Sequence, residues 1–316
     1  MNITAEDIQA AHERIRTFVH RTPILTSTML DHESGAKLFF KCENLQRIGA
    51  FKIRGAMNAV LSLPKEKTAN GIATHSSGNH AQATAYAARQ TGVKAYIVMP
   101  DNSPAVKVNA VKDYGASISF CQPTQAAREA ALHEIVEKTG AAFIHPYNDD
   151  RVMTGQSTAA KELLEDTPGL EMLFAPVGGG GLLSGTLLAT HYFSPKTTVY
   201  AAEPEGAADA VLSVASGRIE TAPYIDTIAD GLMTKLGDKT FPVIKDLVAG
   251  VITVSDKEII SAMKLIYERM KLVVEPSAAV PFAALLKEKE RFRGKKVGII
   301  LSGGNVDLAK LGKWFV

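Results

Sequence analysis

Short apolar runs rich in β-branched residues alternate along the chain with longer alanine-rich stretches. The helical stretches include 80–92 and 126–140, and they separate most of the runs. The predicted strands are 37–43, 71–76, 95–100, 117–121, 141–146, 172–177, 198–204, 251–255 and 297–304. Strands that are bounded by glycine and spaced by helices are typical of parallel sheets covered on both faces. The pattern therefore predicts an α/β protein.

The same pattern suggests how the chain divides. With 316 residues it is long enough for two domains. Residues 71–148 carry four of the predicted strands, which is enough for an open sheet of their own. We expect this segment to be a small mobile domain, inserted in a larger one made of residues 1–65 and 149–316.

Composition narrows the classes of partner. The formal net charge is +2, with 46% hydrophobic and 22% charged residues, so neither nucleic acid nor a membrane surface is expected as partner. No apolar run approaches the roughly 20 residues of a membrane span. The two cysteines, Cys42 and Cys121, are interpreted as reduced thiols. The first residues predict a helix capped at Thr4 rather than a signal peptide, and we expect a cytoplasmic protein.

One lysine lies in an otherwise apolar stretch, IGAFKIRGA, residues 48–56. Lys52 stands there between Phe51 and Ile53. One interpretation is a surface strand whose lysine extends into water. The other is a desolvated amine that forms a Schiff base, because burial lowers the pKa of a lysine and frees the nucleophile. The stretch alone leaves both open.

A run of four glycines follows the predicted strand 172–177, in PVGGGGLLSG. Bare backbone amides at the start of a helix favour an anion, because the helix dipole adds to them. A tight turn would need only one or two glycines. The spacing matches neither GxGxxG nor GxxxxGK[ST], so it favours a phosphate monoester over a nucleotide.

Two further glycine turns follow predicted strands. Ser302–Asn305 lies where open α/β sheets bind ligands, although a plain strand-to-helix turn explains it equally well. Ser76–His80 suits a carboxylate, although an ordinary N-cap accounts for one hydroxyl. His75 and His80 are interpreted as hydrogen-bonded scaffold rather than catalysts. The chain has no HExxH, CxxC or GxSxG motif. A buried lysine together with a loop that binds phosphate is the combination that a pyridoxal 5′-phosphate site requires.

Taken together, these motifs resemble those of a known family, the fold-type II pyridoxal-phosphate enzymes of the serine/threonine dehydratase family. The chain is most similar to its serine racemases and to its members that dehydrate threo-3-hydroxyaspartate. The matching stretches are HRTPILTS, FKCENLQRIGAFKIRGA, SSGNHAQA, PVGGGGLLSG, TIADG, ERMKLVVEPSAAV and LSGGNVD. The resemblance implies a tryptophan synthase β-like fold, with two open twisted sheets and the active site between them.

The resemblance also implies roles for individual residues. Lys52 would bind the cofactor covalently, and Ser77 would act as the acid on the opposite face of the substrate. The other implied cofactor residues are Phe51, Asn79, Gly178, Gly179, Gly180, Gly181, Leu182, Gly231, Glu275 and Ser302. The implied substrate residues are Ser76, Ser77, Asn79 and His80.

Three further expectations come from the family. Glu203, Ala207 and Asp209 match its divalent-cation site, for Mg²⁺ or else Ca²⁺ or Mn²⁺, although their spacing alone suits a solvated loop. Some members bind ATP as an effector near the positions of Ser27, Thr28 and Arg47; Arg47 and Ile48 depart from the animal racemases, so ATP activation stays open. A homodimer is expected on the same ground.

The sequence indicates the preferred substrate less specifically than it indicates the cofactor. Ser77 permits racemisation, whereas Tyr147 replaces the asparagine of animal racemases and weakens that assignment. Arg128 could meet a second substrate carboxylate, or it could equally be a surface charge. We therefore hypothesise a serine racemase that also dehydrates small β-hydroxy amino acids. The alternatives are a dehydratase of threo-3-hydroxyaspartate, or of L-threonine and L-serine, with little racemase activity; a remote one is a non-catalytic regulatory protein that binds a phosphate ligand.

Overall fold

Two sheets organise the computed structural model, which describes residues 3–103 and 105–315. The larger sheet has six strands in the order β1-β2-β10-β7-β8-β9. Only β1 runs antiparallel to its neighbour. These strands are β1 Ile24–Leu25, β2 Lys37–Cys42, β7 Met172–Pro176, β8 Thr198–Pro204, β9 Gly250–Val254 and β10 Lys296–Leu301.

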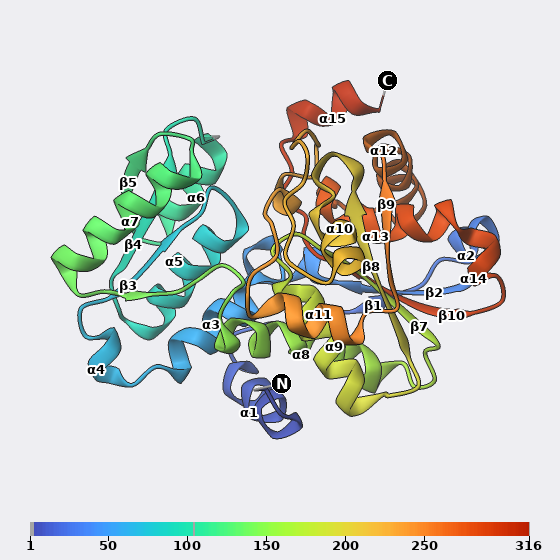
Figure 1. Ribbon diagram of the computed structural model, residues 1–316, viewed down its shortest axis with the longest axis horizontal. Helices are drawn as coiled ribbons and strands as arrows, with labels where there is room; N and C mark the ends of the chain where they lie inside the picture. The colour runs from blue at the N-terminus through green and yellow to red at the C-terminus, as the bar shows by residue number, and fades with distance from the viewer. Residues whose placement is uncertain (1–2, 104, 316) are drawn as a thin grey trace.

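The smaller sheet, on the left in Figure 1, is parallel throughout and has the order β5-β4-β3-β6. Its strands are β3 Ile72–His75, β4 Ala95–Pro100, β5 Ser117–Cys121 and β6 Ala142–Phe143. Helices α5 (Asn79–Thr91) and α6 (Ala105–Asp113) cover one face, and α7 (Gln125–Thr139) covers the other. All of these elements lie within the predicted insertion.

Two apolar clusters pack on opposite faces of the larger sheet. One contains side chains of α12 and α13, and the other those of α8 and α9. The helices outside the smaller sheet are α1 Ala5–Ile15, α2 Thr28–Ser34, α3 Lys52–Ser62, α4 Lys65–Thr68, α8 Asp150–Asp166, α9 Gly181–Phe193, α10 Asp209–Ser216, α11 Thr240–Leu247, α12 Asp256–Leu265, α13 Pro276–Lys287, α14 Lys289–Phe292 and α15 Leu308–Trp314. No helix of the described residues is long and apolar enough to cross a membrane.

Helix α3 lies between the two sheets (Figure 1). Its buried Ile53 and Met57 share one apolar cluster with Ile72 of β3, Ala81 of α5 and Val152 of α8. The helix that carries the candidate lysine is therefore packed against both parts of the molecule. The exact domain border stays a prediction, because this cluster crosses it.

The α/β class is confirmed, with three corrections to the predicted strands. The strand predicted for 297–304 ends at Leu301, before the glycine turn. The strand predicted for 141–146 is limited to Ala142–Phe143, at the edge of the smaller sheet. Pro146 has no amide to donate to a strand, and the chain turns away before it. The apolar pattern also missed β1, because two residues are too short for a period of two to be visible.

Candidate active site

Lys52 is the first residue of α3 and not part of a strand, so the surface-strand interpretation is wrong. Its ammonium group donates a hydrogen bond of 2.8 Å to the carbonyl oxygen of Pro146 and lies 5.2 Å from the centre of the Phe51 ring. Desolvation lowers the pKa of Lys52 to about 8, although the nearby charge of Glu275 opposes this shift. The amine is thus far more readily deprotonated than an ordinary lysine.

A chain of amide side chains leads from Asn79 to a buried carboxyl group. Asn79 Nδ2 donates to Glu275 Oε1 at 2.9 Å, and Asn79 Oδ1 accepts from Asn305 Nδ2, also at 2.9 Å. Asn305 Nδ2 donates in addition to the carbonyl oxygen of Ile48. Burial raises the pKa of Glu275 to about 7. The orientation of the Asn79 amide is therefore fixed from both sides.

The four-glycine loop joins β7 to the start of α9 and can accept a phosphate. Among the described residues, the amides of Gly178, Gly179 and Gly180 donate to no backbone or side-chain acceptor. A Cβ atom on Gly179 would overlap the ring of Tyr147, and one on Gly178 would lie 2.9 Å from Leu232 Cα. Glycine is required by this close packing, and the free amides fit a phosphate group.

The segment Pro146–Tyr147 connects the lysine to the glycine loop. The carbonyl oxygen of Pro146 accepts from Lys52, while the ring of Tyr147 packs on Gly179 and its Cβ and backbone on Gly181. The two features singled out by sequence therefore flank one short segment.

Two other predicted cofactor residues lie at the same place. The amide of Gly231 donates to Ser277 Oγ at 3.1 Å, and the Gly231 carbonyl lies beside Gly178. Ser302 is buried at the end of β10, and its carbonyl oxygen accepts from the amide of Phe51 at 3.0 Å. The structure thus brings the predicted cofactor residues together, although their individual roles stay predictions.

The loop Ser76–His80 connects β3 to α5. Ser76 Oγ accepts from the amide of Gly78 at 3.2 Å, while Ser77 is partly exposed. His80 is buried, and its Nε2 pairs with the carbonyl oxygen of Ile144 at 3.1 Å. Burial, reinforced by the charge of Lys52, lowers the pKa of His80 well below its usual value. His80 is accordingly a neutral, hydrogen-bonded ring, as the scaffold interpretation predicted.

Arg128 lies near the start of α7, beside the ends of β3 and β5. Burial lowers the pKa of His75, at the end of β3, and the charge of Arg128 adds to this; burial raises the pKa of Cys121, at the end of β5, and the same charge opposes that shift. The Nε atom of Arg128 is buried without an acceptor among the described residues. The choice between a contact with a second substrate carboxylate and a plain surface charge stays open for Arg128.

Glu203 lies near the end of β8, and Asp209 is the first residue of α10. Glu203 accepts from the amides of Ala210 and Val211 at 2.7 and 3.1 Å, and Asp209 accepts from the amide of Leu236 at 3.0 Å. Burial raises the pKa of Glu203 to about 8 and that of Asp209 to about 6. These two buried carboxylates, with the buried Ala207 nearby, fit a hard cation with oxygen ligands. Within the described residues, no group of three or more His, Cys, Asp or Glu side chains could hold a metal.

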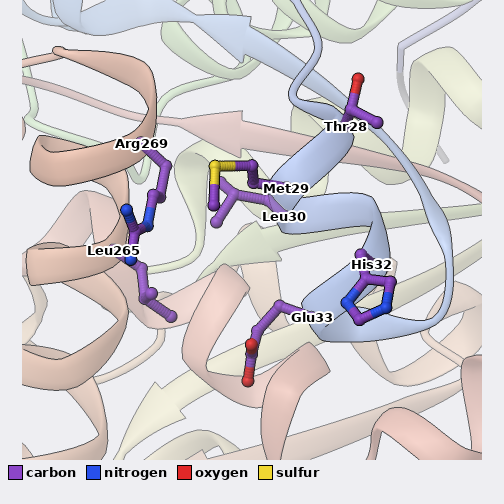
Figure 2. A pocket seen from close by; sticks show the side chains of 7 residues that line it. All are labelled: Thr28, Met29, Leu30, His32, Glu33, Leu265 and Arg269. Atoms are coloured by element: carbon purple, nitrogen blue, oxygen red, sulfur yellow. The ribbon is translucent and has the colours of Figure 1, made fainter.

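A separate cavity of about 380 Å³ lies between α2 and the helix pair α12 and η5 (Ile266–Met270). Figure 2 shows Met29 and Leu30 on the side of α2 that faces Leu265 and Arg269. Thr28 also lines this cavity, whereas the other two residues of the predicted ATP region do not. ATP binding therefore stays a prediction.

Sequence reasoning missed two members of the lysine site. Pro146 acts through its carbonyl oxygen, which every residue has, so no sequence signal could have found it. Asn305 was visible as the end of a glycine turn, but its bond to Asn79 joins residues far apart in the chain.

Comparison with known proteins decides the family. The sequence model of a protein family, described as pyridoxal-phosphate dependent enzyme, matches residues 15–303. The chain belongs to this family. It is 50% identical over 308 residues to a beta-hydroxyaspartate dehydratase of Paracoccus denitrificans, with 98% of each chain covered. It is 48% identical to a serine racemase of Dictyostelium discoideum, covering 98% of this chain and 97% of the relative.

Solved structures agree with this assignment. The maize serine racemase superimposes with a TM-score of 0.96 at 46% identity, covering 100% of this chain and 97% of the maize chain. The fold is that of the fold-type II pyridoxal-phosphate enzymes, as expected, and the family is one of amino-acid racemases and ammonia-lyases. Pyridoxal phosphate is accordingly the cofactor of this family.

Proposed function

We propose that this protein is a serine racemase that also eliminates water from serine, threonine and similar small β-hydroxy amino acids. The supporting observation is the desolvated amine of Lys52, held by Pro146 beside the glycine loop. With a pKa of about 8, a useful fraction of this amine is neutral near neutral pH. A neutral amine can accept the proton of the substrate α-carbon.

The residues around Lys52 would hold the cofactor in one orientation. The amides of the glycine loop and Leu182 would bind the phosphate, Phe51 would pack on the ring, and Asn79 would bind the ring hydroxyl. Ser302 would face the ring nitrogen, and Gly231 and Glu275 would line the ring. When bound, pyridoxal phosphate supplies an electron sink for the electron pair left at the α-carbon.

Elimination and racemisation would begin with the same proton transfer. Lys52 takes the α-proton; for elimination the bond from the β-carbon to its hydroxyl then breaks, and the leaving oxygen receives a proton, which the protonated Lys52 can supply, and departs as water. Because the Ser302 hydroxyl is neutral, it does not stabilise positive charge at the ring nitrogen as a carboxylate would, which favours prompt loss of the hydroxyl or reprotonation. Racemisation needs a proton from the opposite face, and Ser77 is the proposed donor. The relatives named serine racemase in Dictyostelium and maize support racemisation as an activity of this protein.

A second candidate is dehydration of threo-3-hydroxyaspartate. The buried Nε of Arg128, without an acceptor among the described residues, favours a substrate with a second carboxylate. The 50% identity to the Paracoccus beta-hydroxyaspartate dehydratase supports the same candidate. In this variant the Ser76–His80 loop would bind the α-carboxylate and Arg128 the other one.

One experiment distinguishes the candidates. The protein loaded with pyridoxal phosphate and Mg²⁺ is given L-serine, L-threonine or L-threo-3-hydroxyaspartate in separate tubes, and D-serine, oxo acid and ammonia are measured. D-serine and pyruvate from L-serine support the racemase–dehydratase. Oxaloacetate in large excess over both, with little D-serine, contradicts it and supports the second candidate. A protein that gains no visible band with the cofactor would support the non-catalytic alternative.

We also propose a divalent cation, Mg²⁺ or else Ca²⁺ or Mn²⁺, at Glu203, Ala207 and Asp209, because buried carboxylates with raised pKa values gain most from a cation. A homodimer remains a proposal that rests on the family resemblance, and a cytoplasmic location one that rests on the interpretation of the two cysteines as reduced thiols.

A further inference from the structure

A network of buried charges lies directly behind the lysine helix. Arg54 is fully buried on α3, and it pairs with Glu43 after β2 and with Glu162 of α8. Lys41 is also fully buried and donates to Glu162 Oε2 at 2.7 Å. Two cations therefore meet two carboxylates, and the cluster is neutral as a whole.

The guanidinium group of Arg54 is held from several directions. Nε and Nη2 donate to the two oxygens of Glu43 at 2.8 and 2.9 Å. Nη1 and Nη2 donate to the two oxygens of Glu162, each at 2.8 Å. Nη1 also donates to Thr158 Oγ1 and Nη2 to the carbonyl oxygen of His20. This planar fork, bidentate to two carboxylates, fixes the orientation of the side chain as well as its position.

Arg54 and Lys52 project from opposite sides of α3. Positions two apart on a helix are separated by about 200° around its axis. Lys52 accordingly faces Pro146 and the glycine loop, while Arg54 faces the core of the larger sheet. Both residues lie in the first turn, so a rotation of that turn about the helix axis would displace the amine.

A second contact limits the same turn. A Cβ atom on Gly155 would lie 2.5 Å from the carbonyl oxygen of Arg54, so α8 touches the backbone of α3 directly. Gln156 Oε1 accepts from the amide of Gly55 at 3.1 Å. The close crossing fixes the distance between the helices, and the Arg54 fork fixes the rotation of α3.

We propose that Arg54 is a positioning residue for Lys52, acting through its bonds to Glu43 and Glu162. Stability alone does not explain the network, because well-packed apolar side chains often replace a buried ion pair without loss. An apolar core would leave the first turn free to rotate, whereas the fork allows one orientation. The inference rests on the proposed role of Lys52 as the cofactor-binding lysine.

The test uses Arg54→Lys, which keeps the charge and removes the fork. Lys52 of the apoprotein is labelled with a trace of acetic anhydride between pH 6 and 11, and its labelling midpoint is read by peptide mass spectrometry. We expect the midpoint, about 8 in the parent, to rise by about 0.5 or more, because a loosened turn admits water to the amine. The affinity for pyridoxal phosphate, followed by its visible band, should fall about tenfold.

The control is Val254→Ala, a buried change at the end of β9 that should lower the melting temperature without moving the midpoint. A midpoint in Arg54→Lys that moves no more than in the control overturns the inference. Should Arg54→Lys fail to fold, Glu162→Gln is the second variant, because it keeps the shape of the network. It should move the labelling midpoint of Lys52 in the same direction. An unmoved midpoint in Glu162→Gln also overturns the inference.

Borohydride reduction of the loaded parent separates this inference from the proposed function. A cofactor label on a lysine other than Lys52 contradicts the proposed role of Lys52. A label on Lys52, with unmoved midpoints in the variants, contradicts only the role of Arg54.

Discussion

The ammonium group of Lys52, at the start of α3, donates a hydrogen bond of 2.8 Å to the carbonyl oxygen of Pro146. Residue 146 follows the last strand of the smaller sheet, so this bond joins the helix between the sheets to the end of the smaller one. The acceptor is a neutral carbonyl oxygen. The bond therefore offsets little of the free energy that it costs to remove the charged amine from water.

The reactivity of Lys52 should therefore depend on pH near neutrality. The neutral form of the amine is the one that attacks the cofactor. The rate at which pyridoxal phosphate binds to the apoprotein should therefore rise with pH around a midpoint of about 8. The charge of Glu275 opposes the lowering of the Lys52 pKa, whereas the pKa values of His80 and His145 are lowered by burial and, in smaller part, by the charge of Lys52 itself. Stopped-flow measurement of the visible band checks this, and a midpoint near 10.5 would mean a solvated amine.

Ser77→Ala tests the second face of the substrate. We expect D-serine formation from L-serine to fall about 100-fold or more, the usual range for loss of an acid–base group. Pyruvate should stay within about threefold, because Lys52 still removes the α-proton. Both products are quantified from the same tube. An equal loss of both would show that Ser77 serves binding instead of proton transfer.

Arg128→Met tests the second carboxylate. The expected result is a fall of about 10- to 100-fold in kcat/KM for threo-3-hydroxyaspartate, with little change for serine, since a charged hydrogen bond contributes about 1.5–3 kcal/mol. Lys138→Met, an exposed cation on the same helix, is the matched control. Equal losses for both substrates would assign Arg128 to the structure of α7.

Mg²⁺ should stabilise the protein through Glu203. At about 100 times its dissociation constant a ligand adds about 2.7 kcal/mol, which corresponds to several degrees of melting temperature for a chain of this size. Glu203→Gln should abolish this increase. Glu205→Gln, just after the end of β8 and bonded to Lys287, should retain it. An increase that survives Glu203→Gln would place the cation elsewhere.

Lys107 and Asp230 form the one ion pair between residues 71–148 and the remainder of the described chain, at 2.5 Å. Asp230 precedes Gly231, and Lys107 Nζ lies 3.8 Å from where a Cβ on Gly78 would be, so the pair links the segments that carry these two glycines. Because Asp230 is half exposed, the pair should contribute under about 1 kcal/mol to folding.

Asp230→Asn should nevertheless open this part of the molecule. We expect faster hydrogen exchange in residues 71–148 and a KM raised about threefold, and 0.5 M NaCl should have a similar effect on the parent by screening. Asp150→Asn, which removes the exposed pair with Lys239, is the control. Unchanged exchange in Asp230→Asn would contradict a closing role.

The structure confirmed much of what local pattern predicted, because local pattern reports on nearest neighbours. The strands β4, β5 and β8 begin and end where their apolar runs do. The capping box at Thr4 forms as predicted, and the glycine loop starts a helix. In each case the signal and the structure involve residues within a few positions of one another, so periodicity and turn chemistry are sufficient.

Contacts between distant segments were decided only by the tertiary structure. The apolar stretch around Lys52 was compatible with a surface strand, whereas in the structure it begins helix α3, which packs against α5 and α8. The partners of Arg54 come from three other segments, and nothing in the sequence near Arg54 names them. The sequence by itself determined which side chains and backbone groups were available for the chemistry. Their pKa values and orientations depend on burial and on partners far away in the chain, which only the folded arrangement provides.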